Sequence, residues 1–351
     1  MRSPSTASPR ILIVKPSSLG DILHTLPLLR TLRAAYPSAF IAWIVEGAFL
    51  EVLEGDPDLD EIIVVRTKRW RKEITPSTAR EIWNTLRRLR GNRFDIAIDL
   101  QGLVKSGVMA WLSGAGTRVG FHRADMREPV NALFMNKNAE RARPGKHAVE
   151  RGLALLEPLG IRDMKLEYGY RVSEADAESA RIFFEERQPR GPLVALNAGY
   201  GFPTKAWDLK KYAALGDRLM GELNCSLLLT WGPGERGMVE EIAGKMKHAP
   251  WIPPATTIRQ SAAFFRRCAL FIGSDTGPMH LCVVLGVKCL VLMGPTEPAR
   301  NGPFGPGHRV IQKDLPCKNC YKRRCETVEC MKRIEVEEVF EAASAMLAGK
   351  N

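Results

Sequence analysis

A tight turn of small residues separates an apolar run from a helical pattern at two places in this chain. In the C-terminal half the turn Gly273–His280 (GSDTGPMH) follows the apolar run Leu270–Ile272, and near the N-terminus Pro16–Asp21 (PSSLGD) follows Ile11–Lys15. In α/β proteins this order presents backbone N–H groups to a phosphate at the start of a helix. One such turn in each half predicts two facing domains with a ligand cleft between them.

Strand-like and helix-like patterns alternate along the rest of the chain. The predicted strands are residues 11–15, 40–45, 62–65, 95–100, 193–196, 226–231, 270–272 and 289–293. The predicted helices are residues 20–36, 78–89, 104–112, 147–159, 209–220, 238–246, 260–267, 279–285 and 335–347. Because regular alternation is typical of parallel sheets, we expect an α/β fold with a parallel sheet in each half.

Chain length and the positions of Pro and Gly residues indicate the domain limits. A chain of 351 residues suits two domains better than one. Residues 160–192 are charged, weakly patterned and end in a Pro- and Gly-containing run, so we expect an N-terminal domain over 10–175 and a C-terminal domain over 176–351. Residues 1–9 lack the apolar core of a signal peptide and are expected to be a disordered leader. No apolar stretch approaches the ~20 residues of a membrane-spanning helix, and we expect a cytoplasmic protein.

The formal net charge of +12 at pH 7 favours an anionic partner. Charge alone leaves nucleic acid, an acidic membrane surface and an acidic substrate open. The densest run is Lys68–Lys72 (KRWRK), and Lys105, Arg127 and Arg151 add further cations to the first half. Such side chains could bind carboxylates and phosphates, or they could form a solvated surface. A single basic run with one Trp is a poor signature of nucleic-acid binding.

Three residues at predicted strand ends could carry chemistry. Asp21 either caps a helix or acts as a general base on a substrate hydroxyl. Lys205 is either a point charge that binds phosphate or a solvated loop lysine. Glu235 either accepts hydrogen bonds from ribose hydroxyls or is simply an acid at a helix start.

The turn at residues 273–280 is a candidate anion site. Thr276, Gly277 and the following amides could bind a diphosphate with help from the helix dipole. Pro278 suits the first helical position because its missing N–H is not needed there. The alternative is a plain turn without a ligand. His280 is then a core histidine bonded to backbone.

A polar segment near the C-terminus, residues 317–330, contains four of the eight cysteines. They are Cys317, Cys320, Cys325 and Cys330. Their number suits a tetrahedral metal, but only the first pair has the common zinc spacing. We therefore favour free thiols over a structural zinc and expect no catalytic metal.

Several motifs occur together in a specific order. They are residues 11–27 (ILIVKPSSLGDILHTLP), 68–72 (KRWRK), 98–106 (IDLQGLVKS), 127–129 (REP), 147–151 (HAVER), 205–207 (KAW), 231–232 (WG), 274–281 (SDTGPMHL) and 294–298 (GPTEP). Over nearly its whole length the chain resembles the bacterial heptosyltransferases of glycosyltransferase family 9. The resemblance implies a GT-B fold, two Rossmann-like domains whose parallel sheets face each other across a central cleft. It also implies inverting, metal-independent transfer of heptose from ADP-L-glycero-D-manno-heptose to the Kdo of the lipopolysaccharide inner core.

The same resemblance implies roles for individual residues. Asp21 would be the catalytic base, and Lys205 would bind the leaving diphosphate. The donor-binding residues would be Ser18, Gly20, Thr204, Glu235, Asp275, Thr276, Gly277 and His280. The acceptor-binding residues would be Lys68, Arg69, Arg71, Lys72, Lys105, Arg127, His147 and Arg151. No cofactor beyond the donor sugar is implied.

The implied partners are an acidic lipid A–Kdo acceptor and the anionic inner face of the inner membrane, with the enzyme a peripheral monomer. The cysteine segment departs from the first-heptose pattern, which leaves the exact acceptor and donor sugar open. Other functions that the sequence allows are transfer of a different nucleotide sugar to another core or surface glycan, epimerisation of a nucleotide sugar, binding of one without catalysis, and nucleic-acid binding.

Overall fold

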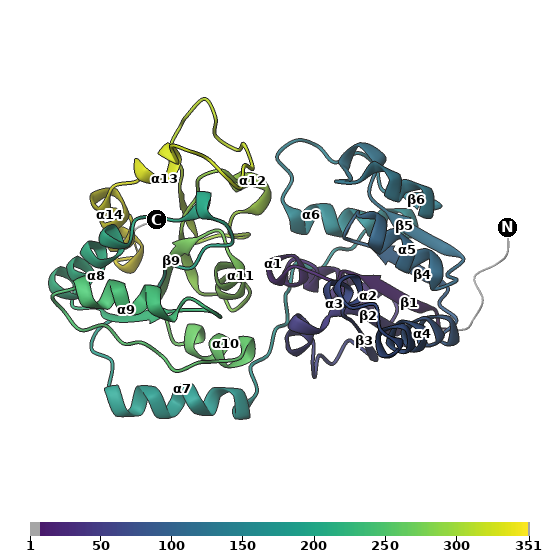
Figure 1. The fold of residues 1–351 in the computed structure, drawn as a ribbon, viewed down its shortest axis with the longest axis horizontal. Helices are drawn as coiled ribbons and strands as arrows, with labels where there is room; N and C mark the ends of the chain where they lie inside the picture. The colour runs from purple at the N-terminus through teal and green to yellow at the C-terminus, as the bar shows by residue number, and fades with distance from the viewer. Residues whose placement is uncertain (1–7, 350–351) are drawn as a thin grey trace. The chain divides into compact units, whose positions relative to one another are not determined.

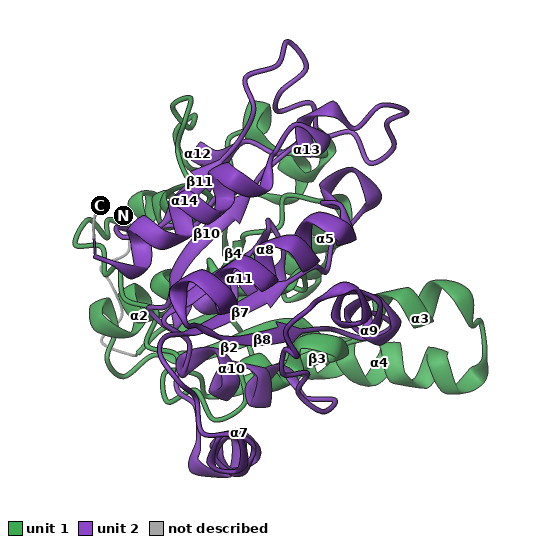
Figure 2. Cartoon of the chain, turned by 90° about the vertical axis from the view of Figure 1, so that its left-hand side faces the viewer, with its two compact units in different colours: residues 1–170 green, residues 171–351 purple. Residues whose placement is uncertain are grey.

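A computed structural model describes residues 8–349 of the chain. Most of the predicted leader, residues 1–7, lies outside the described residues. The chain divides into two compact units, residues 1–170 (unit 1) and 171–351 (unit 2), which Figure 2 colours separately. The boundary expected after residue 175 falls inside helix α7 (Glu174–Arg187), which belongs to unit 2.

The described part of unit 1 contains one sheet of six parallel strands in the order β3-β2-β1-β4-β5-β6 (Figure 1). Their bounds are β1 Arg10–Val14, β2 Phe40–Glu46, β3 Glu61–Val65, β4 Ile96–Asp99, β5 Thr117–Gly120 and β6 Lys137–Asn138. The central strands are apolar and almost continuously buried because both faces of the sheet are covered. The order reverses between β1 and β4, which makes that point the switch point of the sheet.

The helices of unit 1 connect these strands. They are α1 Leu19–Leu23, α2 Leu26–Ala35, α3 Thr67–Lys72, α4 Pro76–Gly91, α5 Val104–Leu112 and α6 Ala148–Leu153, with the 3-10 segments η1 Gly47–Val52, η2 Arg123–Asp125, η3 Pro129–Phe134 and η4 Ala154–Leu159. The single helix predicted over 20–36 is two helices, because Pro27 cannot donate an N–H and would clash with the preceding turn. The helix predicted over 147–159 is α6 followed by η4, which contains Pro158.

The described part of unit 2 contains five parallel strands in the order β11-β10-β9-β7-β8. Their bounds are β7 Leu193–Asn197, β8 Ser226–Thr230, β9 Leu270–Ser274, β10 Lys288–Leu292 and β11 Arg309–Ile311. Trp251 adds a single parallel bridge beside β8, where its N–H and C=O bond to the backbone of Leu227 and Leu229, each at 2.8 Å. Counted with this bridge, the strand order matches that of unit 1, and the switch point lies between β7 and β9.

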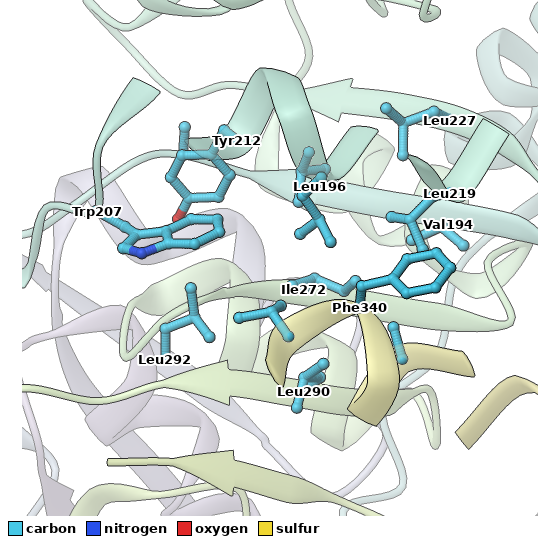
Figure 3. Packing of buried hydrophobic residues seen from close by; sticks show 14 of the residues in the cluster. Val194, Leu196, Trp207, Tyr212, Leu219, Leu227, Ile272, Leu290, Leu292 and Phe340 are labelled. Carbon is cyan, nitrogen blue, oxygen red and sulfur yellow. The ribbon is translucent and has the colours of Figure 1, made fainter. Parts of the chain in front are cut away.

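The helices of unit 2 are α7, α8 Leu209–Leu223, α9 Arg236–Lys245, α10 Ile258–Arg266, α11 Gly277–Val284, α12 Pro298–Asn301, α13 Glu329–Lys332 and α14 Val336–Leu347, with the 3-10 turn η5 Pro203–Lys205. A buried cluster packs α8 and α14 on the sheet, with Trp207 and Tyr212 at one end and Phe340 at the other (Figure 3). The Trp207 indole donates to the C=O of Ile334 at 2.9 Å. This bond ties the loop after β7 to the start of α14.

Both units confirm the predicted α/β class with parallel sheets. Among residues 8–349, every helix is too short or too polar to span a bilayer.

Candidate active site

Both turns singled out in the sequence lie at the switch point of a sheet. In unit 1 the loop after β1 lies beside the loop after β4, and in unit 2 the loop after β7 lies beside the loop after β9. Open α/β sheets bind ligands at such points, outside the carboxyl ends of the strands. Each unit therefore carries a candidate ligand site of its own.

Asp21 lies in the first turn of α1 and caps that helix. Its Oδ2 accepts hydrogen bonds from the backbone N–H of Ser18 at 3.0 Å and from the Ser18 hydroxyl at 2.8 Å. Its Oδ1 lies 3.4 Å from Nζ of Lys15, and 43% of the Asp21 side chain remains exposed. The cap and the general base, left as alternatives by the sequence, are therefore compatible: the carboxylate fixes the turn and still reaches solvent. Gly20, beside it, is buried within α1.

The surroundings of Asp21 keep it ionised. Burial acts to raise its pKa, but Lys15, the two hydrogen bonds from Ser18 and the nearby His24 outweigh burial and lower the pKa to about 2. At neutral pH this side chain is a negative charge that can accept a proton.

Lys15 is a site residue that the sequence analysis quoted but did not assign. It is buried at the end of β1, and its Nζ donates to the C=O of Leu100, just past β4, at 2.7 Å. The lysine thus joins the two loops of the switch point and faces Asp21. A lysine that ends an apolar strand was the signal available in the sequence.

Asp99, at the end of β4, is a second residue that the sequence analysis left unassigned. It is fully buried, and its carboxylate accepts hydrogen bonds from the Ser106 hydroxyl at 2.9 Å and the Asn131 amide at 2.6 Å. Burial raises the pKa of Asp99 in spite of these donors. The contacts fix the start of α5, where the predicted acceptor residue Lys105 is exposed.

Two of the expected acceptor-binding residues have structural contacts on α6. His147 is buried, its Nδ1 accepts the N–H of Val149 at 3.2 Å, and its ring lies edge-on to His24 with centroids 5.0 Å apart. Arg151 donates to the C=O of Asp125 at 3.2 Å. His24 joins His147 to the environment of Asp21, so these residues connect α6 to the first turn of α1.

The other expected acceptor residues are exposed cations. They are Lys68, Arg69, Arg71 and Lys72 on α3, Lys105 on α5, and Arg127 before η3. Arg69 pairs with Glu73 at 2.8 Å, whereas its three basic neighbours on α3 form no hydrogen bond or ion pair with residues 8–349. Lys68, Arg71 and Lys72 are therefore available to an anionic ligand, whereas Arg69 already has an acidic partner.

Lys205 and Asp275 form a buried ion pair at the switch point of unit 2. The Lys205 Nζ donates to Oδ2 of Asp275 at 2.6 Å and to its C=O at 2.8 Å, and the two side chains are only 11% and 7% exposed. The Thr296 hydroxyl donates to the same Oδ2 at 2.8 Å, and His280 Nε2 lies 3.3 Å from Oδ1. Burial acts to raise the pKa of Asp275, but His280 and Lys205 hold it well below its usual value. An ammonium has three N–H donors, of which Asp275 takes two, and the Nζ also lies 4.7 Å from the centre of the Phe202 ring.

The helix α11 begins beside this pair with its first amides uncapped. Its N-cap residue is Thr276, whose hydroxyl is 3.3 Å from the C=O of Ser274 and does not bond to the helix. Gly277 is the first residue of the helix and Pro278 the second, one position later than the sequence predicted. Backbone N–H groups and the positive end of the helix dipole can therefore meet an anion there. The structure brings together Lys205 and this turn.

Glu235 lies in the neighbouring loop after β8. Its Oε2 accepts the N–H of Gly232 at 2.8 Å, and its carboxylate packs so closely on Gly199 that a Cβ there would lie 2.6 Å from Oε2. Gly199 follows β7, so Glu235 belongs beside the lysine loop without contacting the Lys205–Asp275 pair. This position suits recognition of hydroxyl groups on a nucleotide.

The four-cysteine segment adjoins the lysine loop. The Thr204 hydroxyl donates to the C=O of Lys322 at 2.7 Å, and the Arg323 guanidinium lies 5.8 Å from the centre of the Phe202 ring. Cys317, Cys320 and Cys325 are exposed and Cys330 is half-buried. Within residues 8–349, no group of three or more His, Cys, Asp or Glu side chains is arranged to hold a metal ion. Burial raises the pKa of the Cys330 thiol, and the nearby Cys317 and Cys320 add to that rise. The preference for free thiols over zinc stays a prediction.

The candidate sites of the two units differ in their chemistry. Unit 1 presents an ionised carboxylate that can take a proton from a hydroxyl. Unit 2 presents a buried lysine beside uncapped helix amides, which can bind a diphosphate and stabilise added negative charge on it. A proton acceptor and a diphosphate site are the requirements of group transfer from a nucleotide sugar to an alcohol.

Comparison with known proteins places the chain in a family. A model of glycosyltransferase family 9 (heptosyltransferase) matches residues 82–331. Lipopolysaccharide heptosyltransferase 1 of Pseudomonas aeruginosa is 32% identical over 321 residues, which are 90% of this chain and 87% of that protein. A family 9 glycosyltransferase of Veillonella parvula superposes with a TM-score of 0.85 and 25% identity, covering 99% of this chain and 100% of that one.

A second solved structure is also similar. The E. coli heptosyltransferase WaaC with ADP-2-deoxy-2-fluoro heptose superposes with a TM-score of 0.76 and 25% identity, covering 95% of this chain and 99% of that one. These matches span both units and confirm the family and fold that the motifs implied. The chain belongs to glycosyltransferase family 9 and is a glycosyltransferase of GT-B fold.

Proposed function

We propose that this enzyme transfers a heptose from ADP-L-glycero-D-manno-heptose to the Kdo of the lipopolysaccharide inner core, with inversion at the transferred carbon. The similarity to lipopolysaccharide heptosyltransferase 1 and to a structure with an ADP-heptose analogue supports this donor and acceptor. The proposal assigns the acceptor to unit 1 and the donor to unit 2.

On the acceptor side, Asp21 is the general base. With a pKa of about 2 it is ionised but weak, so it takes the proton of the acceptor hydroxyl as that oxygen bonds to the sugar carbon. Lys15 and Ser18 hold the carboxylate in place. The exposed cations on α3 and α5 would bind the carboxylates and phosphates of the acceptor, and Arg127 would join them.

On the donor side, Lys205 and the first amides of α11 bind the diphosphate. As the glycosidic bond breaks, the departing ADP gains negative charge, which the ammonium and the helix amides stabilise without a divalent cation. Asp275 and His280 position Lys205, and Glu235 would accept hydrogen bonds from the ribose. We also expect a monomer that associates peripherally with the inner face of the inner membrane, which the net charge of +12 supports.

One observation carries this proposal: a half-exposed carboxylate is held ionised at one switch point while a buried lysine adjoins an uncapped helix start at the other. The test is transfer from ADP-heptose to a Kdo-terminated acceptor by the wild type and by Asp21→Asn. We expect the variant to lose activity by a factor of about 100 or more while its affinity for ADP stays the same. Full activity in Asp21→Asn would contradict the assignment of the base.

A nucleotide-sugar epimerase is the alternative from another reaction class. It would convert ADP-heptose in the absence of any acceptor, whereas the proposed transferase would release ADP only in step with glycosylation. Parallel assays with UDP- and GDP-sugars test the donor, because preference for either would contradict ADP recognition.

A further inference from the structure

Unit 1 exposes an unusual concentration of large apolar side chains. They are Ile74, Trp83, Trp111, Val130 and Leu133. Exposure reaches 96% for Ile74 and 82% for Leu133, and both Trp rings are more than half exposed. Apart from these five, only four large hydrophobic side chains are exposed elsewhere in the described residues. Exposed apolar side chains that gather on one surface of a domain mark an interaction site.

The five side chains come from neighbouring elements. Ile74 lies in the turn between α3 and α4, which form the helical hairpin visible in Figure 2, Trp83 is on α4, Trp111 is on α5, and the other two are on η3. The helix α4 packs against α5, and α5 packs against η3. Arg90 of α4 also donates to the C=O of Leu112 in α5 at 3.0 Å.

The topology puts these elements on one side of the sheet. The connections β3 to β4, β4 to β5 and β5 to β6 all run in the same direction across the sheet. Right-handed crossovers that run in one direction cover the same face, so α4, α5 and η3 form a single layer. The five side chains therefore all belong to this layer, and we call its exposed surface the apolar face.

The charge around the apolar face is positive. The helix α4 contains four arginines and one glutamate, and the Arg87 guanidinium lies 6.0 Å from the centre of the Trp83 ring. Arg71 and Lys72 are exposed next to Ile74 and make no ion pair within residues 8–349. Lys105 and Arg127 are exposed on the adjoining elements. A second copy of the chain would bring like charges together, whereas an anionic lipid surface would complement them.

We propose that the apolar face docks unit 1 on an anionic bilayer. The two Trp rings and the aliphatic side chains enter the headgroup boundary, where Trp is favoured, and the arginines and lysines bind lipid phosphates. The inference rests on the proposed function for its setting, because a lipid-anchored acceptor brings the enzyme to a membrane. It adds the surface that makes the contact.

The test uses the full-length protein and sedimentation with vesicles of phosphatidylcholine, with and without phosphatidylglycerol. We expect binding only when phosphatidylglycerol is present. The variant Trp83→Ser/Trp111→Ser/Leu133→Ser should bind these vesicles at least about tenfold more weakly, because a factor of ten corresponds to only ~1.4 kcal/mol and burial of one such side chain exceeds this. The matched control is Leu166→Ser/Ile182→Ser, which removes exposed apolar side chains from outside the apolar face and should bind as the wild type does.

The readouts separate this inference from the proposed function. The triple variant should retain full transfer to a soluble, deacylated Kdo acceptor, which also shows that it folds. If the wild type transferred no heptose to that acceptor, the proposed function would be contradicted. The result of vesicle binding would still stand. Equal vesicle binding by the triple variant and the wild type, or no binding by the wild type, would overturn the docking surface. So would a wild-type dimer that the triple substitution converts to a monomer.

Discussion

The two switch points use the same pair of residue types in opposite ways. In each unit a lysine from the loop after one central strand donates to a backbone carbonyl just past the neighbouring central strand. In unit 1 the strands are β1 and β4 and the acceptor is the C=O of Leu100, and in unit 2 they are β7 and β9 and the acceptor is the C=O of Asp275. In unit 1 the partner acid, Asp21, comes from the lysine's own loop and is 43% exposed. In unit 2 the acid lies across the switch point and is buried among three donors.

The difference shows how one topology can supply two chemistries. In unit 1 the lysine is buried and the carboxylate of Asp21 is half-exposed, so negative charge faces the solvent. In unit 2 the carboxylate of Asp275 is buried beneath Lys205 and the start of α11, so the lysine is held in place as a positive charge.

The largest effect should come from breaking the buried pair. Asp275→Asn leaves the Lys205 ammonium buried without its anion, which costs roughly 3–5 kcal/mol of stability. Asp21→Asn should change stability far less, because that side chain is half-exposed. Urea unfolding of both variants measures the contrast. Equal losses of unfolding free energy in the two variants would contradict the difference between the two ion pairs.

Removal of the donor-side lysine should mainly affect the transition state. Lys205→Met should lower kcat by a factor that corresponds to roughly 2–4 kcal/mol, as loss of an oxyanion donor does. Circular dichroism checks the fold of the variant, and steady-state kinetics separate kcat from KM. A change confined to KM would show that the lysine binds the ground state and the transition state equally.

Removal of the acceptor-side lysine should shift the pH profile. Lys15 lowers the pKa of Asp21 and burial raises it, so Lys15→Met should raise that pKa. The acidic limb of kcat/KM would then move toward neutral pH. Lys165→Met, which removes an exposed lysine of unit 1, is the control and should leave the limb in place. An unmoved limb in Lys15→Met would mean that Asp21 does not set it.

The smallest effect concerns acid stability. The pKa of Asp21 lies at about 2, below its ordinary value of 3.8, so its contribution is complete above about pH 4 and is lost as the pH falls toward 2. Asp21→Asn should therefore lose less stability than the wild type over this interval, by at most about 1 kcal/mol because the pair is partly exposed. Unfolding at a series of pH values measures the slope, and identical slopes would contradict the ion pair.

The sequence predicted the strand–helix alternation well where strands are apolar and central. It did not predict β5, β6 or β11, because these strands are short and carry polar residues, and both residues of β6 are exposed. The helix α7 was not predicted either, because most of its residues are polar and only Ala180, Phe183 and Phe184 are buried.

Long-range contacts limited what could be predicted of the site. Lys15 and Leu100 are 85 positions apart, so nothing local to β1 signals their hydrogen bond. Thr296 lay in a recognised motif, but its contact with Asp275 appears only once β9 and β10 pair. Their positions after predicted strands marked Asp21 and Lys205 as candidates, and the resemblance implied their roles. Those catalytic roles remain predictions.

The single bridge at Trp251 has a consequence for solubility. Every residue of β8 is buried and its centre is apolar. If its outer backbone N–H and C=O groups were unpaired, a strand of another chain could pair with them. Trp251 occupies the backbone groups of Leu227 and Leu229 that such a strand would need. This one residue therefore makes the edge strand of unit 2 less able to pair with another chain, and so opposes aggregation.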